Sequence, residues 1–230
     1  MEKQTVLIIA AHPDDEILGC GGTMSRLVQE GHSLHVAICG EGVTSRSDVL
    51  PETEKAQRID ALQQCCRKAC GLLGVNPPLF FNFPDNRFDT VPLLDIVKNV
   101  EVLIDKYKPD TVFTHHAGDL NIDHVILNRA VLTATRPMKG ASVKDIYCFE
   151  IPSSTDWNFQ HFSPSFRANL FYDIHEFLKV KIEALKIYES EFCSFPHPRS
   201  EKAITAIARR WGSHVGMEAA EAFEIVRVMR

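Results

Sequence analysis

Apolar residues along the chain follow two rhythms, which predict strands and helices in alternation. Short continuous apolar runs, typical of buried parallel strands, occupy residues 5–11, 33–39, 79–83, 111–114 and 145–151. Apolar residues at helical spacing occupy residues 19–31, 53–73, 93–107, 124–135, 177–191 and 201–211. The order predicts an α/β fold, in which helices cover both faces of a mainly parallel sheet.

Polar residues follow directly after four of the predicted strands. They occupy residues 12–16, 41–48, 85–87 and 115–124. The carboxyl ends of parallel strands lie at one edge of a sheet, and ligands of such folds bind beyond that edge. The four polar segments are therefore predicted to meet there, and the active site is expected at the C-terminal edge of the strands.

The first polar segment places one histidine and three acids within five residues. Such a cluster at the end of a buried strand costs free energy unless something such as a bound cation uses it. His12 and Asp15 can offer a nitrogen and an oxygen to the same metal ion, which leaves Asp14 free to act on a water bound there. Glu16 is expected to be an acid at a helix entry, without a chemical role.

A third candidate ligand, His124, lies in the polar segment after the fourth strand. With His12 and Asp15 it makes a set of two histidines and one carboxylate, which is typical of a catalytic Zn2+ that keeps a fourth position for water. Fe2+ can occupy the same ligands. Each segment by itself is more often a solvated turn or a helix N-cap. Their joint placement at one sheet edge favours the metal.

Two other motifs have competing interpretations. The glycines of segment 19–22 could bind a phosphate, but they come eight residues after the strand. They also lack the third glycine at the spacing that the dinucleotide fingerprint requires. Close packing of a helix on the sheet explains them better. Cys66 and Cys70 could hold a structural zinc from one helix face. Since no second Cys or His pair has suitable spacing, we expect them to be small buried side chains.

Composition indicates a globular protein, predicted to form one domain over residues 1–230, with 45% hydrophobic and 24% charged residues. A net charge of −5 and scattered Lys and Arg residues argue against nucleic-acid binding. Seven cysteines without framework spacing predict reduced thiols. We see neither a secretory signal nor an apolar stretch of about 20 residues for a membrane helix, and expect a cytoplasmic protein. The sequence does not distinguish a monomer from a homo-oligomer.

Several segments resemble the PIG-L/LmbE-like family, the N-acetylglucosaminyl-phosphatidylinositol de-N-acetylases. Residues 11–16 read Ala-His-Pro-Asp-Asp-Glu and match the family's first motif in full. Residues 83–87 resemble its P-D segment, and residues 119–124 resemble its second metal motif. Weaker resemblance near the C-terminus covers residues 181–185, 188–190, 195–200 and 219–223.

The resemblance implies a Rossmann-like three-layer sandwich that binds Zn2+ through His12, Asp15 and His124 and uses Asp14 as general base. The implied reaction is hydrolysis of the N-acetyl group of an N-acetylglucosamine-type amino sugar or sugar conjugate. Two other functions stay open. One is a metal-dependent amidase acting on a thiol-sugar conjugate, and the other is a non-catalytic module that binds a sugar or nucleotide.

One position departs from the family pattern. The second motif commonly reads H-x-D-H, and its first histidine helps to stabilise the oxyanion, but Asn121 stands at that position. An amide can donate a hydrogen bond without carrying a charge. Either Asn121 is a neutral donor, or the cationic role falls to one of three other histidines, His115, His116 or His197.

Further residues are expected to support the reaction. Asp123 is expected to orient a neighbouring donor. The aromatic segment 157–162 could form a sugar-stacking lid, a packed loop or a subunit contact. Substrate-binding side chains are expected among Arg46, Arg58, Arg87 and His197.

Overall fold

The computed structural model of the chain describes residues 3–46 and 51–230. Within these residues, seven strands form one sheet in the order β3-β2-β1-β4-β5-β7-β6. Strands β1 to β5 pair in parallel, whereas β7 is antiparallel to both of its neighbours, β5 and β6. The strands are Thr5–Ala10 (β1), Ser33–Gly40 (β2), Leu79–Phe83 (β3), Thr111–His115 (β4), Asp145–Phe149 (β5), Leu170–Asp173 (β6) and Ala220–Arg227 (β7).

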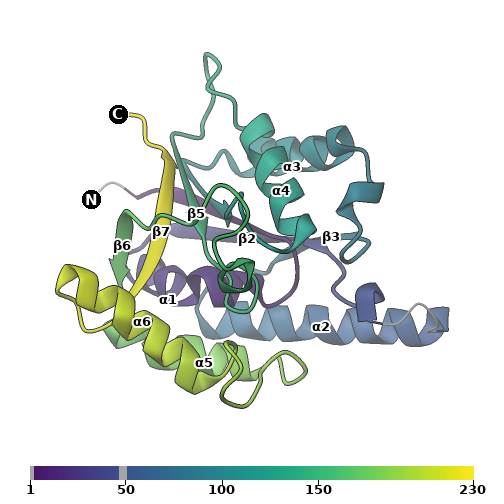
Figure 1. The fold of residues 1–230 in the computed structure, drawn as a ribbon. Helices are drawn as coiled ribbons and strands as arrows, with labels where there is room; N and C mark the ends of the chain where they lie inside the picture. The colour runs from purple at the N-terminus through teal and green to yellow at the C-terminus, as the bar shows by residue number, and fades with distance from the viewer. Residues whose placement is uncertain (1–2, 47–50) are drawn as a thin grey trace.

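Helices cover both faces of the sheet and make three layers (Figure 1). Helices α3 and α4 pack together on one face, and α1, α2, α5 and α6 lie on the other. The predicted α/β fold with a mainly parallel sheet is confirmed. The helices are Asp15–Gln29 (α1), Glu52–Leu72 (α2), Leu93–Tyr107 (α3), Ile122–Ala134 (α4), Leu178–Lys186 (α5) and Glu201–Val215 (α6), with short 3-10 helices at Thr44–Arg46 (η1), Phe88–Thr90 (η2), Asp156–Asn158 (η3) and His175–Phe177 (η4).

Strand β1 contributes to the hydrophobic cores on both faces of the sheet. Successive side chains of a strand point to opposite faces. Val6 and Ile8 accordingly join the core that contains residues of α1 and α2, whereas Leu7 and Ile9 join the core beneath α3 and α4. Burial on both faces explains why this strand is a continuous apolar run.

Strands β1 and β4 are neighbours in the sheet, although β2 and β3 come between them in sequence. The chain leaves β1 toward α1 on one face and leaves β4 toward α4 on the other face. Such a switch point opens a crevice beyond the carboxyl ends of the two strands. The candidate site lies at this crevice, because the segments that follow β1 and β4 meet there.

Helix α1 begins at Asp15, four residues earlier than predicted. The partial positive charge at a helix N-terminus favours its first-turn acids, Asp15 and Glu16. The glycines serve packing, because a Cβ at Gly19 would lie 2.5 Å from the Phe149 ring. The backbone amide of Gly22 donates a hydrogen bond to the chain's own Glu221 carboxylate at 2.9 Å. This contact argues against a phosphate loop.

Two strands were not predicted from the apolar pattern. Strand β6 is half-buried along its length, and β7 is buried only over its first four residues. Neither therefore shows the continuous apolar run of a central strand. Helix α5 is also shorter than predicted and ends at Lys186, after which the chain turns toward α6.

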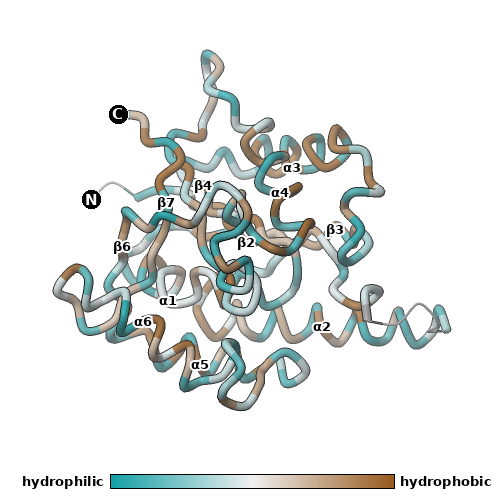
Figure 2. Tube along the Cα trace, viewed as in Figure 1, coloured by the Kyte–Doolittle hydropathy of each residue, from teal (hydrophilic) through white to brown (hydrophobic). Residues whose placement is uncertain are grey.

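All seven cysteines are free thiols, and Cys66 and Cys70 on α2 are buried in the core, as predicted. The thiol of Cys66 lies 3.6 Å from the Glu16 carboxylate. In the described part of the chain, no helix has both the length and the apolarity needed to span a bilayer. Helices such as α6 instead alternate between hydrophobic and hydrophilic residues (Figure 2).

Candidate metal centre

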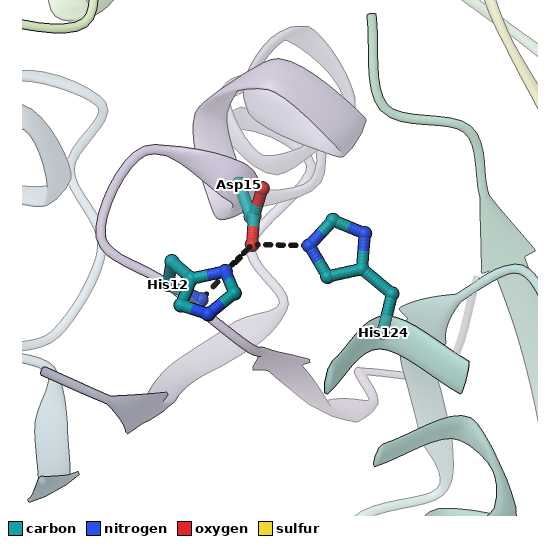
Figure 3. A group of neighbouring side chains, drawn as sticks. All are labelled: His12, Asp15 and His124. Atoms are coloured by element: carbon teal, nitrogen blue, oxygen red, sulfur yellow. Dashed lines mark hydrogen bonds and ion pairs between the residues drawn. The ribbon is translucent and has the colours of Figure 1, made fainter. Parts of the chain in front are cut away.

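His12, Asp15 and His124 meet at the carboxyl edge of the sheet (Figure 3). The Asp15 Oδ2 atom lies 3.3 Å from His12 Nδ1 and 3.2 Å from His124 Nε2. One ligand atom from each residue lies within 4.8 Å of the other two. Two imidazole nitrogens and one carboxylate oxygen at this spacing can hold one transition-metal ion and leave room for water.

Local backbone structure positions each of these three side chains. His12 follows β1, and its backbone amide donates a hydrogen bond to Asp15 Oδ2 at 2.9 Å in the turn that starts α1. His124 lies in the first turn of α4. Asn121 is the N-cap of that helix and accepts a hydrogen bond from the Asp123 amide at 2.9 Å. The site is thus built on the first turns of two helices.

The second ring nitrogen of His12 faces two acids. His12 Nε2 lies 2.9 Å from Asp123 Oδ2 and 3.1 Å from Asp85 Oδ1. Asp123 is held in turn by the backbone amides of Asn86 and Phe88, at 2.6 and 2.9 Å. These two carboxylates would hold a proton on Nε2, and Nδ1, on the side of Asp15, is then the nitrogen available to a metal.

The surroundings of His124 favour positive charge. Its Nδ1 atom lies 3.2 Å from Asp119 Oδ1, and neither ring nitrogen makes a well-formed hydrogen bond to a described residue. Burial lowers the pKa of His124, but Asp15 and Asp119 outweigh that effect and raise it to about 9. A buried nitrogen without a hydrogen-bond partner, among acids that favour a cation, fits a metal ligand.

Asp14 lies beside these residues in a strained backbone conformation. Its φ of 112° costs about 1–3 kcal/mol for a residue other than glycine. The Asp14 amide donates a hydrogen bond to the Glu16 carboxylate at 3.0 Å, and Arg199 Nη1 donates one to Asp14 Oδ2 at 2.6 Å. Burial raises the pKa of Asp14, and Arg199 opposes that shift. The carboxyl group is therefore fixed in place at the site.

Glu16 is fully buried, and its carboxylate helps to hold Asp14 in place. The hydroxyl of Tyr188 donates a hydrogen bond to Glu16 Oε1 at 2.5 Å. Burial raises the pKa of Glu16 to about 7. The sequence-based view of Glu16 as a simple helix-entry acid was incomplete, because its carboxylate joins α1 to the turn after α5.

Arg199 was not among the arginines that the sequence suggested. Its Nε atom donates a hydrogen bond to Ser153 Oγ at 2.8 Å, and its Nη1 atom lies 3.5 Å from Glu191 Oε2. The family-like segment 195–200 was the only signal for this residue, and that segment drew attention to His197 instead. Packing of the turn before α6 against the sheet edge brings Arg199 to Asp14.

A cavity of about 130 Å³ opens over the candidate ligands. Asn121 and several charged residues from distant segments of the chain line this cavity. Among the described residues of its lining, Arg199 carries the permanent positive charge. The lining includes Asp14, Asp85, Asn121, His124, Glu191 and Arg199.

The three other histidines considered for the cationic role do not line the cavity. His115 stacks on His124 with ring centroids 3.9 Å apart, but its Nε2 atom accepts a hydrogen bond from the Ala11 amide at 2.8 Å, which keeps the ring neutral. His116 instead contacts Glu224 and the Pro164 carbonyl. His197 packs against Trp157, with ring centroids 5.4 Å apart. These positions leave Arg199 as the cation beside Asp14.

Of the predicted substrate arginines, Arg58 and Arg87 do not line the small cavity. Arg46 ends η1, and its side chain falls outside the described residues. Arg58 is exposed on α2, 2.6 Å from Glu54, and Arg87 is exposed at the start of η2. Arg58 lines a larger groove that adjoins the cavity.

The sequence profile of the PIG-L family, described as GlcNAc-PI de-N-acetylase, matches residues 7–135. This span is more than half of the chain and contains all three candidate ligands and Asp14. The chain belongs to the PIG-L family. Membership confirms the resemblance inferred from the motifs and the expected enzyme class, that of the de-N-acetylases.

A curated relative and a solved structure are similar to this chain over most of its length. The uncharacterized deacetylase YaiS of Escherichia coli K12 is 28% identical over 195 residues, which cover 82% of this chain and 92% of YaiS. The N,N'-diacetylchitobiose deacetylase of Pyrococcus horikoshii superposes with a TM-score of 0.78 at 19% identity, over 98% of this chain and 85% of that enzyme.

The same fold also supports other chemistry. GalB of Pseudomonas putida KT2440, a 4-carboxy-2-hydroxymuconate hydratase, superposes with a TM-score of 0.76 at 19% identity, over 99% of this chain and 98% of GalB. The fold by itself therefore does not identify the reaction, and the side chains of the site must carry that argument.

Proposed function

We propose that this PIG-L protein is a zinc-dependent N-deacetylase that hydrolyses the acetamide of an N-acetylglucosamine-type sugar or sugar conjugate. One observation carries the proposal. His12, Asp15 and His124 surround one point, and the Asp14 carboxyl group is fixed beside them in the same cavity. A metal ion held next to a general base is one arrangement that can hydrolyse an unactivated amide.

Zn2+ held by His12, Asp15 and His124 would act as a Lewis acid on water and on the acetamide carbonyl. Asp14 takes a proton from the attacking water and returns it to the amine nitrogen as the C–N bond breaks, so one carboxylate is base and then acid.

Asn121 is suited to donate to the developing oxyanion. Its Oδ1 atom accepts the hydrogen bond from the Asp123 amide, which leaves the side-chain NH2 group as a donor at the cavity. Arg199 keeps the Asp14 carboxylate in position through its 2.6 Å hydrogen bond.

The function is tested by acetate release from purified protein loaded with Zn2+. Free N-acetylglucosamine, its disaccharide, an inositol conjugate and a thiol-sugar conjugate form the substrate panel. We expect release from at least one N-acetyl sugar, with one equivalent of zinc by elemental analysis. Acetate release from the thiol conjugate alone would assign the protein to thiol-sugar substrates instead. No release from any member of the panel would contradict the proposal.

Substitution of Asp14 tests its role as the base. Asp14→Asn should keep the fold and the zinc content but lower kcat by about 10²–10⁴-fold, because an amide cannot carry the proton. His124→Ala is the contrasting variant and should lose zinc as well as activity. Near wild-type turnover by Asp14→Asn would remove Asp14 from the mechanism, and unchanged zinc in His124→Ala would remove His124 from the ligands.

A further inference from the structure

The cavity over the candidate ligands is too small for a whole sugar conjugate. It measures about 130 Å³, whereas pockets that enclose small molecules usually measure about 300–1,000 Å³. An acetamide group and part of a sugar ring can fill it. The rest of a conjugate must then lie in a neighbouring space.

One neighbouring groove is continuous with the cavity. It measures about 840 Å³, lies between α2 and the end of α5, and shares Gly42, Leu62 and Glu191 with the lining of the cavity. The two helices lie side by side below the sheet in Figure 1. A second large groove, along α6, has no lining residue in common with the cavity among the described residues. Continuity therefore selects the groove between α2 and α5.

The floor of this groove is apolar. Val43 is buried there, and Leu62, Cys65 and Ile187 are partly buried. Among the described residues of the lining there is no aromatic side chain, the type on which sugar rings and bases commonly stack. The floor thus suits an alkyl or aryl group better than a second sugar or a nucleoside.

The rim of the groove is charged but balanced. Three basic residues face three acidic ones, and two of the basic ones have acidic partners of their own. Arg58 pairs with Glu54 and Lys186 pairs with Glu201, each at 2.6 Å. A diphosphate would find no net positive field here. The six charged residues of the lining are Arg58, Lys68, Lys186, Glu183, Glu189 and Glu191, of which Glu191 is buried where the groove meets the cavity.

We infer that the groove between α2 and α5 binds the aglycone of the substrate, an uncharged alkyl or aryl group joined to the amino sugar. The inference rests on the proposed function, because the acetamide of the same molecule must lie at the candidate metal ligands. Arg58, which the sequence suggested for substrate binding, then lies at the rim of the aglycone site.

The test compares kcat/KM for free N-acetylglucosamine, its octyl glycoside and its uridine-diphosphate conjugate. Each buried methylene contributes about fourfold, so the octyl glycoside should exceed the free sugar by at least tenfold. Ala61 is exposed on α2 and lines the groove. Ala61→Trp should fill the groove and reduce the preference for the octyl glycoside over the free sugar by at least tenfold.

Ala206→Trp is the matched control, because Ala206 is exposed on α6 and lines the second groove. It should leave the preference unchanged. Equal kcat/KM for the octyl glycoside and the free sugar, a preference for the uridine-diphosphate conjugate, or an effect of Ala206→Trp instead of Ala61→Trp would overturn the inference while the deacetylase function stands. Calorimetric binding of the octyl glycoside to both variants gives the same comparison without turnover, so absence of acetate release would contradict the proposed function separately.

Discussion

Asp14 shows how single residues of the site depend on contacts from far along the chain. Its positive φ is unfavourable by itself. Glu16 holds its amide, Tyr188 holds Glu16, and Arg199 holds its carboxylate from 185 residues away. The geometry of the proposed base is therefore a property of the packed molecule as well as of its motif.

Removal of Arg199 should lower turnover. Arg199→Ala is expected to reduce kcat by about 10²-fold, because a displaced base costs on that order, whereas the zinc content stays the same. Arg199→Lys should recover part of the loss, and Arg209→Ala, at an exposed position of α6, should behave as wild type. Steady-state kinetics decide the point: a rise in KM with unchanged kcat would mean that Arg199 binds substrate and does not position Asp14.

The Tyr188 hydroxyl should contribute to stability. Tyr188→Phe leaves the fully buried Glu16 carboxylate without one of its donors, which should lower the free energy of unfolding by about 1–3 kcal/mol. Urea unfolding measures the difference. Tyr107→Phe is the comparison, because Tyr107 is only partly buried in α3 and stacks on His35. Equal stability of Tyr188→Phe and wild type would show that the hydroxyl contributes nothing.

At the scale of the secondary-structure element, the packing of helix α1 determines where one candidate ligand lies. It carries a candidate ligand in its first turn, and the position of that turn depends on how closely the helix lies against β5. Gly19 permits this approach, because any larger side chain meets the Phe149 ring. The close packing expected of the glycines in segment 19–22 thus helps to position the helix that presents Asp15.

Two glycine substitutions separate packing from helix propensity. Gly19→Ala should lower the free energy of unfolding by about 1–3 kcal/mol through overpacking against Phe149. Gly71→Ala, in α2 with no atom within 4 Å of the added Cβ, should be neutral or stabilise by up to about 1 kcal/mol. Thermal or urea unfolding gives both values. A Gly19→Ala protein as stable as wild type would contradict the close contact.

At the scale of the whole molecule, the candidate centre joins the two faces of the sheet. His12 lies just before α1 and Asp15 is the first residue of α1, whereas His124 belongs to α4 on the opposite face of the sheet. A metal bound by all three would bridge these layers, because its ligands come from both. Binding to the folded chain alone would then stabilise the whole molecule.

Removal of the metal should therefore lower Tm. Zinc at about 1,000 times its Kd contributes about 4 kcal/mol, which corresponds to about 8–16 °C for a chain of this size. Differential scanning calorimetry before and after chelation, with zinc added back, measures the shift. The His124→Ala variant should show little response to the chelator, and an unchanged Tm in the wild type would speak against a bridging metal.

The sequence by itself determined the order of most helices and strands and the two motifs of the site. Buried parallel strands are continuous apolar runs, and His12, Asp14 and Asp15 are so close in sequence that local geometry brings them together. Placement of His124 beside them followed from a general rule of parallel sheets. These features depend on the spacing of residues within short segments and on a sheet topology that has few alternatives.

Only the tertiary structure decided the contacts of the C-terminal third. Strand β6 lies at the edge of the sheet, and β7 pairs antiparallel with both β6 and β5. Arg199 reaches Asp14 because α5, α6 and the turns between them pack against the carboxyl edge of the sheet. No local periodicity encodes which side chain a distant turn delivers to a cavity. The cationic partner of Asp14 and the groove beside α2 therefore became visible only in the folded chain.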